Sequence, residues 1–154
     1  MAKEQLDFGE SPCSATAMRK ASRRLTQLYD DALTPCGLRS TQFTILAELH
    51  RRTRQPPTMA ELAQSLVMDR SALGHNLRPL ERDGLLLLQE GAEDRRRRHV
   101  KLTDQGLAAF KEARRLWQTA QDRFEAIYGA ENAATLRTVL LSIAYDGRLA
   151  TLKD

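Results

Sequence analysis

Four consecutive arginines, Arg95–Arg98, form the densest charge cluster in the sequence. Segments with strand-like composition, 85–89 and 99–102, flank the run, so the arginines are predicted to lie at the tip of a hairpin. Like charges repel one another, and a nucleic-acid backbone supplies the anions that offset this repulsion. Asp94 precedes the run, and its carboxylate could brace the guanidinium of Arg96. The run predicts contact with the minor groove of a duplex, whereas the alternative is a solvated charge cluster.

A second group of polar side chains lies on a segment with helical spacing just before the hairpin. Leu73, Leu77 and Leu80 mark its buried face. The other face carries the side chains that we expect to meet DNA: Arg70, Ser71, Ala72, His75, Asn76 and Arg78. Hydroxyl, imidazole and amide groups can hydrogen-bond base edges, and an alanine methyl can touch a thymine methyl. Arg78 lies further along the helix and suits phosphates better. The alternative is an ordinary exposed helix surface.

Capping residues predict the elements that must position these side chains. Thr58 and Glu61 have the spacing of a capping box, which predicts a short helix after Thr58. A turn follows, and Asp69 is the expected N-cap of the helix with the polar face. That helix should end at 83–84, and Pro79 inside it predicts a bend in its C-terminal half.

The order of these elements is short helix, turn, second helix, basic hairpin and long helix, which is the order of a winged helix-turn-helix. Few functions need a helix and a basic ribbon side by side, and reading duplex DNA is the main one. Arg54, in the polar connector before the short helix, and Thr58 are expected to contact phosphates and set the register on the duplex. For Thr58 the alternative is capping alone.

Long helices are predicted on both sides of this unit. Apolar residues spaced by three and four mark a helix over 14–33. A longer stripe runs from Leu107 to Ile127, and a last helix follows Gly129. The chain has 154 residues, is 42% hydrophobic and carries a net charge of +4. It fits a single domain, 1–154, of mainly α class with a β wing, preceded by a loose polar tail.

Several other functions find no support in the residue pattern. We expect no metal site and no cofactor, because the three histidines lack ligand spacing. No hydrolase triad, phosphate-cradling glycine loop or pair of catalytic carboxylates stands out, so an enzyme is not expected. The sequence shows no secretory segment and no apolar run long enough for a bilayer, which predicts a cytoplasmic protein without a membrane partner.

From about Ala17 onward the sequence resembles the MarR family of transcriptional regulators. The matching motifs are GLRSTQF at 37–43, ELA at 61–63, SAL at 71–73, LERDGL at 80–85, Asp94-x-Arg96 and LTxxG at 102–106. This resemblance implies a homodimer joined by helices in 12–37 and 104–154, around a winged helix-turn-helix at 38–103. It also implies a pseudo-palindromic operator, with Arg96 in the minor groove and braced by Asp94. Many members carry an arginine in place of His75, which leaves the base preference open.

The resemblance further implies control by a small molecule or oxidant that changes the spacing of the two reading heads. The chain is therefore predicted to be a ligand-responsive repressor. Tyr29 and Trp117 are candidates for the effector pocket. Arg19 and Arg23 lie four residues apart on one helix face, where either could hold the carboxylate of an aromatic acid. The alternatives are packing for the aromatic residues and a solvated face for the arginines.

The two cysteines leave a second function open. Cys13 and Cys36 do not make a disulfide scaffold, and they are either ordinary thiols or an oxidant switch that bridges a dimer. Peroxide-sensing members of the family carry a reactive cysteine in the first helix. Ala15 aligns with that position, and Cys13 lies two residues earlier. A thiol-based oxidant sensor and a protein-interaction module remain alternatives to the repressor.

Overall fold

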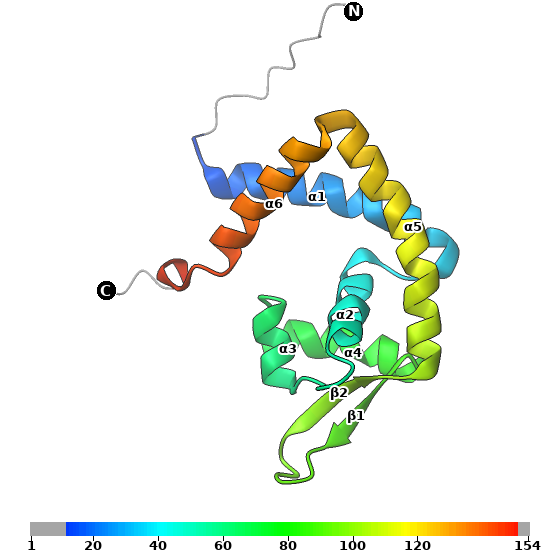
Figure 1. Ribbon diagram of the computed structural model, residues 1–154. Helices are drawn as coiled ribbons and strands as arrows, with labels where there is room; N and C mark the ends of the chain where they lie inside the picture. The colour runs from blue at the N-terminus through cyan, green and yellow to red at the C-terminus, as the bar shows by residue number, and fades with distance from the viewer. Residues whose placement is uncertain (1–11, 151–154) are drawn as a thin grey trace, which may run out of the picture.

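The computed structural model describes residues 12–150. Its helices are α1 (Ser14–Leu33), α2 (Ser40–Arg51), α3 (Met59–Ser65), α4 (Arg70–Arg82), α5 (Asp104–Tyr128) and α6 (Ala130–Ala144), with short 3-10 turns at Thr34–Cys36 and Gly147–Leu149. Strands β1 (Leu86–Glu90) and β2 (Arg98–Leu102) pair antiparallel, with Leu88 opposite Val100. The mainly α class with a β wing is confirmed (Figure 1). The predicted tail, 1–11, lies outside the described residues.

The helices form two groups along the long axis of the molecule. Helices α2, α3 and α4 and the wing (86–102) form a winged head, and α5 leads away from it to the far end (Figure 1). There α1 packs against α5, and α6 turns back toward α3. No helix within residues 12–150 is long and apolar enough to cross a membrane.

The core lies under the winged head and is rich in leucine. Its fully buried side chains include Leu33, Ile45, Leu46, Leu62, Leu73, Leu80, Leu86 and Val100. Phe43 extends this core toward α5, because its ring lies 5.7 Å from those of both Phe110 and Trp117. The predicted buried face of the polar helix is confirmed, since Leu73, Leu77 and Leu80 are at most 2% exposed.

The capping predictions are confirmed, and they fix where the helices of the head begin. The Thr58 hydroxyl accepts a hydrogen bond from the Glu61 N–H, and the Asp69 carboxylate accepts one from the Ala72 N–H. Thr103 caps α5 in the same way. Helix α4 continues past Pro79 to Arg82, so the proline does not end it.

Gly106, in the first turn of α5, packs closely against the backbone of Leu85 just before the wing. A Cβ at this position would collide with the backbone carbonyl oxygen of Leu85, so only glycine allows this close approach. The Thr103 hydroxyl donates to the Gly84 carbonyl at 2.7 Å and accepts from the Gly106 N–H at 2.9 Å. The end of α4, the wing and the start of α5 are therefore held as one unit.

Helix α6 exposes an apolar face to solvent. Its apolar side chains are widely exposed: Leu136 42%, Val139 49%, Leu140 37%, Leu141 54% and Ile143 37%. The apolar spacing predicted the helix, but one chain leaves most of this face uncovered. Ala133 is the residue of α6 that the chain buries. A contiguous exposed apolar face of this kind is a sign of a contact with another molecule.

Candidate nucleic-acid interface and effector cavity

Helix α4 presents its first two turns to solvent. Arg70, Ser71, His75 and Arg78 are exposed, and Ala72 and Asn76 are half-buried. The Asn76 side-chain N–H donates to the Ala72 carbonyl at 2.8 Å. One of the two amide hydrogens is therefore used within the helix, and the other hydrogen and the amide oxygen stay available to a base. His75 has the freer side chain for base contact.

The start of α3 carries a closed pair of polar residues. The Glu61 carboxylate accepts from the Thr58 N–H at 2.7 Å and from the Thr58 hydroxyl at 3.1 Å. The backbone hydrogen bond from Thr58 lowers the pKa of Glu61, so this side chain is ionised at neutral pH. Glu61 thus serves the cap, and its charge is already satisfied by donors at the helix start.

The wing is fixed to the segment that leads into α3. The Val100 N–H donates to the Pro57 carbonyl at 2.8 Å, and His99 Nδ1 lies 3.0 Å from the Pro56 carbonyl oxygen. Thr58 and His99 also form an isolated β-bridge. These contacts set the distance between the base of the wing and the N-terminus of α3.

At the wing tip, Asp94 makes a different contact from the predicted one. Its carboxylate accepts from the backbone N–H of Arg96 at 2.9 Å, and its ion pair is with Arg97 Nε at 3.9 Å. Asp94 therefore shapes the turn beneath Arg96, and the structure shows no side-chain pairing between these two described residues. The guanidinium groups of Arg95–Arg98 are all exposed.

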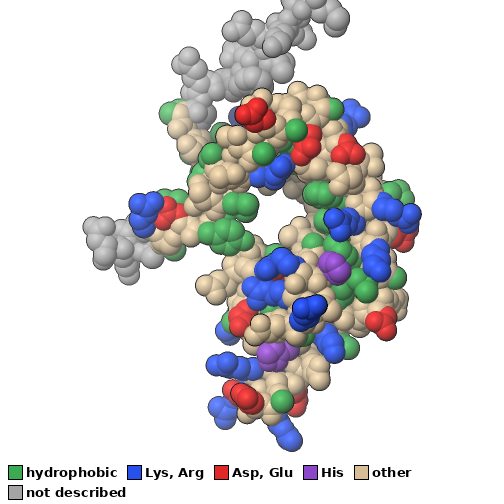
Figure 2. All heavy atoms as spheres, viewed as in Figure 1, with side chains coloured by type: hydrophobic (Ala, Val, Ile, Leu, Met, Phe, Trp, Pro, Cys, Tyr) green, Lys and Arg blue, Asp and Glu red, His purple; other side chains and the backbone are tan. Residues whose placement is uncertain are grey.

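The start of α3, the start of α4 and the wing meet around one hollow of about 490 Å³, which we call the basic hollow. It is lined by Thr58, Met59, Ala60, Glu61, Arg70, Arg96, Arg97 and Arg98. Residues far apart in the sequence thus meet here: Arg70 of α4 and three arginines of the wing present cations to the same space, and α3 contributes the Glu61 carboxylate to its lining. Figure 2 shows Lys and Arg side chains gathered around the wing end of the molecule.

Arg54 lies apart from the basic hollow, in a neighbouring hollow of about 890 Å³. Arg51 and Arg52 line the same space, and both pair with the Glu48 carboxylate, at 2.7 and 2.8 Å. The hydrogen bond from Arg51 is the main cause of the lowered pKa of Glu48. Arg51 and Arg52 thus share the single negative charge of Glu48. Arg54, which sequence reasoning selected, is exposed.

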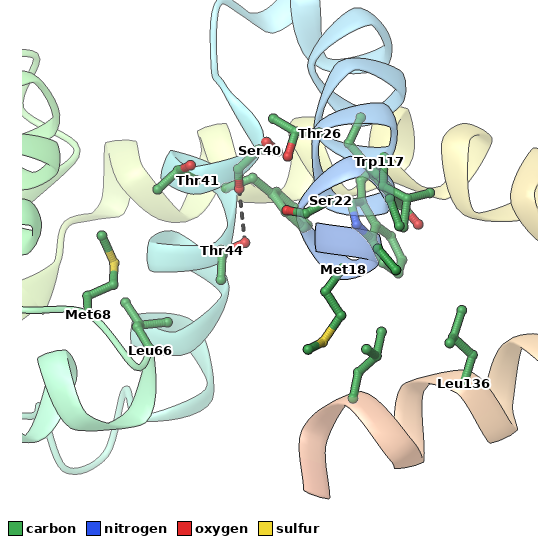
Figure 3. Close-up of a pocket in the computed structure, with 16 residues that line it drawn as sticks. Met18, Ser22, Thr26, Ser40, Thr41, Thr44, Leu66, Met68, Trp117 and Leu136 are labelled. Carbon is green, nitrogen blue, oxygen red and sulfur yellow. Dashed lines mark hydrogen bonds between the residues drawn. The ribbon is translucent and has the colours of Figure 1, made fainter. Parts of the chain in front are cut away.

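A second kind of site lies between the head and the long helices. It is a cavity of about 800 Å³ bounded by α1, α2, α5, α6 and the turn between α3 and α4 (Figure 3). Tyr29 and Trp117, both predicted pocket residues, line it, with ring centroids 6.0 Å apart. Burial raises the pKa of Tyr29. Its hydroxyl donates to Gln121 Oε1 at 2.6 Å.

The predicted pocket arginines do not belong to this cavity. Arg19 and Arg23 are exposed on α1, and neither lines it. Each follows a cavity residue, Met18 or Ser22, by one position, and one residue turns the side chain by about 100° around a helix. The two arginines share a face, as the spacing predicted, but that face points away from the cavity.

The sequence and the fold of this chain are similar to those of known proteins. Residues 38–97, from the start of the head to the wing, match the MarR family. The M. tuberculosis transcriptional regulator MOSR, solved in complex with DNA, is 35% identical, with a TM-score of 0.76 over 86% of this chain and 93% of that one. The chain belongs to the MarR family. It is a transcriptional regulator with a winged helix-turn-helix head.

Two further proteins are similar to this MarR-family chain. The repressor CouR, known from Rhodococcus jostii RHA1, is 28% identical in a structure bound to a 23-mer DNA duplex, with a TM-score of 0.78 over 86% of this chain and 92% of that one. An uncharacterized HTH-type transcriptional regulator from Bacillus cereus is 31% identical over 87 residues. That match spans 56% of either chain, about half the length of the curated relative. These relatives are transcriptional regulators, a class of protein distinct from enzymes.

Sequence reasoning missed the hydroxyl groups of the cavity. Ser22 and Thr26 on α1, and Ser40 and Thr44 on α2, line it. Each pair is spaced by four residues, so each pair shares one helix face. This spacing was visible in the sequence, but nothing in it indicated that the two faces meet.

The two cysteines of this MarR-family chain lie at opposite ends of α1. Cys13 is the exposed N-cap residue, and Cys36 follows the C-terminal end. The 20 residues of α1 separate them by about 30 Å, so no disulfide can join them within one chain. Hydrogen bonds from the side chain and backbone of Thr16 lower the pKa of Cys13. The Cys36 thiol donates to the Leu33 carbonyl at 3.1 Å.

Proposed function

We propose that this MarR-family regulator binds duplex DNA with α4 in the major groove and the wing in the adjacent minor groove. The observation that carries the proposal is the basic hollow, where the starts of α3 and α4 meet Arg96–Arg98 of the wing. Helix N-termini and guanidinium groups both attract phosphate. The MOSR and CouR structures, which share this fold, hold DNA, which supports the same use of this surface.

We assign a role to each predicted DNA-binding residue by its position. His75, Ser71, Ala72 and Asn76 face bases from α4, and Arg96 enters the minor groove with Asp94 shaping the turn below it. The remaining residues contact the backbone and set the register: Arg54, Thr58, Arg70, Arg78, Arg95, Arg97 and Arg98. The exposure of these arginines supports the assignment.

We also propose that the regulator acts as a homodimer. The exposed apolar face of α6, at Leu136–Ile143, needs a partner, and a second copy supplies an identical face through a two-fold axis. Residues 12–37 and 104–154 would then form the dimerisation region, with 38–103 as the reading head. Two heads related by such an axis read a pseudo-palindromic operator with half-sites about one helical turn apart.

The cavity gives this regulator a means of responding to a ligand. It touches α1, α5 and α6 of the dimerisation region and, through Leu66 and Met68, the turn before α4. A ligand that favours one arrangement of these parts shifts the population toward it and changes the DNA affinity. We propose that the unliganded dimer represses by occupying its operator and that a ligand in the cavity releases it.

Selection of bound sequences from a random duplex pool, together with sedimentation of the purified protein, tests this function. We expect the pool to converge on an inverted repeat and the protein to sediment as a dimer at micromolar concentration. Asn76→Ala should relax the preference at one base pair per half-site. A stable monomer, or a pool that does not converge at low salt, would refute the proposal.

An oxidant sensor is the second candidate, and the exposed Cys13 thiol with its lowered pKa favours it. Because Cys13 and Cys36 are far apart within one chain, any disulfide of Cys13 must form with another molecule, such as the second copy. Peroxide should then reduce DNA affinity in the wild type and not in Cys13→Ser. Equal loss in both proteins would reject the role of Cys13.

A further inference from the structure

Tyr145, the residue that follows α6, reaches across to the helix-turn-helix. Its hydroxyl donates to the backbone carbonyl of Ser65, the last residue of α3, at 2.6 Å. We propose that this hydrogen bond is a latch: it holds the turn between α3 and α4 in the conformation that binds DNA, and so makes DNA affinity depend on where α6 lies. This inference rests on the proposed function. It assigns Tyr145 a positioning role, which acts through the turn and not through contact with DNA.

The turn between α3 and α4 is a Schellman motif. The Met68 N–H donates to the Ala63 carbonyl at 2.9 Å, and the Val67 N–H donates to the Gln64 carbonyl at 3.2 Å. These two bonds satisfy two carbonyls in the last turn of α3 and leave the carbonyl of Ser65 to an outside donor. The latch supplies that donor, so it completes the hydrogen bonding of this helix end.

Val67 makes this turn costly. It has φ of 52°, and glycine usually occupies the left-handed position of a Schellman motif, because a β-branched side chain crowds the backbone there. The Val67 side chain is 57% exposed, so packing returns little of this cost. The turn is therefore poorly stabilised by its own residues, and a hydrogen bond from outside can change how often it is populated.

The loose attachment of α6 to its own chain allows the latch to respond to a partner. Ala133 is buried and Arg137 pairs with Glu125 of α5 at 3.3 Å, whereas the apolar side chains over Leu136–Ile143 are exposed. From this anchored start, α6 runs back toward α3 (Figure 1). In the proposed dimer a second copy covers the exposed face, so dimer packing sets the position of α6. Packing that moves the end of α6 also moves Tyr145 relative to the turn.

The test removes the hydroxyl alone. Tyr145→Phe keeps the ring and deletes the donor. Tyr128→Phe is the matched control, because Tyr128 at the end of α5 is 59% exposed and Tyr145 is 60% exposed. Hydrogen exchange of the full-length protein, followed by mass spectrometry, reports the turn directly. We expect exchange across 66–72 to rise about fivefold in Tyr145→Phe and to stay unchanged across the wing.

DNA affinity shows whether the latch controls reading. The probe is a labelled 30-base-pair duplex that carries the inverted repeat selected from the random pool. Fluorescence anisotropy should show Tyr145→Phe binding this duplex about threefold to tenfold more weakly than the wild type, and Tyr128→Phe binding it equally well. Sedimentation should show the same dimer for all three proteins, so dissociation would not account for the loss.

Val67→Gly separates a latch from a merely structural contact. Glycine adopts the left-handed conformation without crowding, so the turn no longer depends on an outside donor. Removal of the Tyr145 hydroxyl in the Val67→Gly background should therefore change the DNA affinity by less than about twofold. A loss of equal size in both backgrounds would show that the hydroxyl acts elsewhere and would overturn the inference.

The remaining outcomes are equally clear. Unchanged exchange across 66–72 in Tyr145→Phe would overturn the latch, and so would faster exchange across the whole head, because the contact would then only stabilise the fold. Faster exchange at the turn with unchanged DNA affinity would overturn its control of reading. If the wild type bound no duplex while the exchange difference persisted, the proposed function would fail and the contact between α6 and the turn would remain.

Discussion

Removal of the Arg96 side chain should weaken DNA binding and reduce its dependence on salt. Arg96 is exposed at the wing tip, lines the basic hollow, and lies on a turn that Asp94 holds through a backbone hydrogen bond. Arg96→Ala therefore removes one cation and leaves the turn intact. Asp94 keeps its ion pair with Arg97.

The magnitude follows from counterion release. Each cation that displaces a counterion contributes about 0.9 to the slope of log affinity against log salt. A dimer loses two such cations, so the slope should flatten by about 1.8. Between 50 and 200 mM salt, the wild type should then lose about 12-fold more affinity than the variant loses.

Fluorescence anisotropy of a mixed-sequence 30-base-pair duplex, titrated at several KCl concentrations, measures this slope. The matched control is Arg114→Ala, which removes an exposed arginine from α5. Arg114 lies ten residues beyond the first residue of α5, or about 15 Å along the helix, which exceeds the screening length at 0.1 M salt. We expect Arg114→Ala to keep the wild-type slope. If Arg96→Ala also kept it, Arg96 would not contact DNA.

Three further variants test single contacts. Asp94→Asn keeps an acceptor for the Arg96 N–H and removes a negative charge, so anisotropy should show tighter non-sequence-specific binding; weaker binding would mean that the charge itself orients an arginine. Thr58→Ala removes the cap of α3 and should lower the free energy of unfolding in urea by about 1 kcal/mol, whereas Thr58→Ser should retain it. Glu48→Gln breaks the pairs with Arg51 and Arg52 and should cost about 1 kcal/mol at pH 7. Because the folded-state pKa of Glu48 lies below the ordinary 4.5, this stabilisation is present above pH 4.5 and is lost as the pH falls through the folded value. Urea unfolding at several pH values should show the difference between Glu48→Gln and the wild type shrinking below pH 4.5, and a constant difference would contradict this account.

The head could be predicted from sequence because its determinants are local. Each cap joins residues three apart, as in Thr58 with Glu61 and Asp69 with Ala72, so residue type and spacing are sufficient. The buried leucines of α4 follow from helical periodicity in the same way. The arginine run was visible as a run, and the hairpin around it followed from the flanking strands.

The cavity could not be predicted because it depends on how distant helices pack. The stripe on α1 gave its face, but whether Ser22 or Arg23 points inward depends on a rotation of one residue, which only the packing against α2 and α5 decides. Likewise, the hydrogen bond from the Tyr145 hydroxyl to the Ser65 carbonyl joins residues 80 apart, at 2.6 Å. No local pattern marks either partner.

The turn between α3 and α4 connects the cavity to the reading helix. Val67 has φ of 52°, a left-handed conformation that costs a β-branched residue about 1–2 kcal/mol. Its neighbours Leu66 and Met68 line the cavity, and Asp69, the next residue, caps α4. A ligand that displaces Leu66 or Met68 therefore acts on the segment that sets the direction of α4. Because the Ser65 carbonyl is held by Tyr145 at the end of α6, a shift of α6 in the dimer reaches the same turn from the other side.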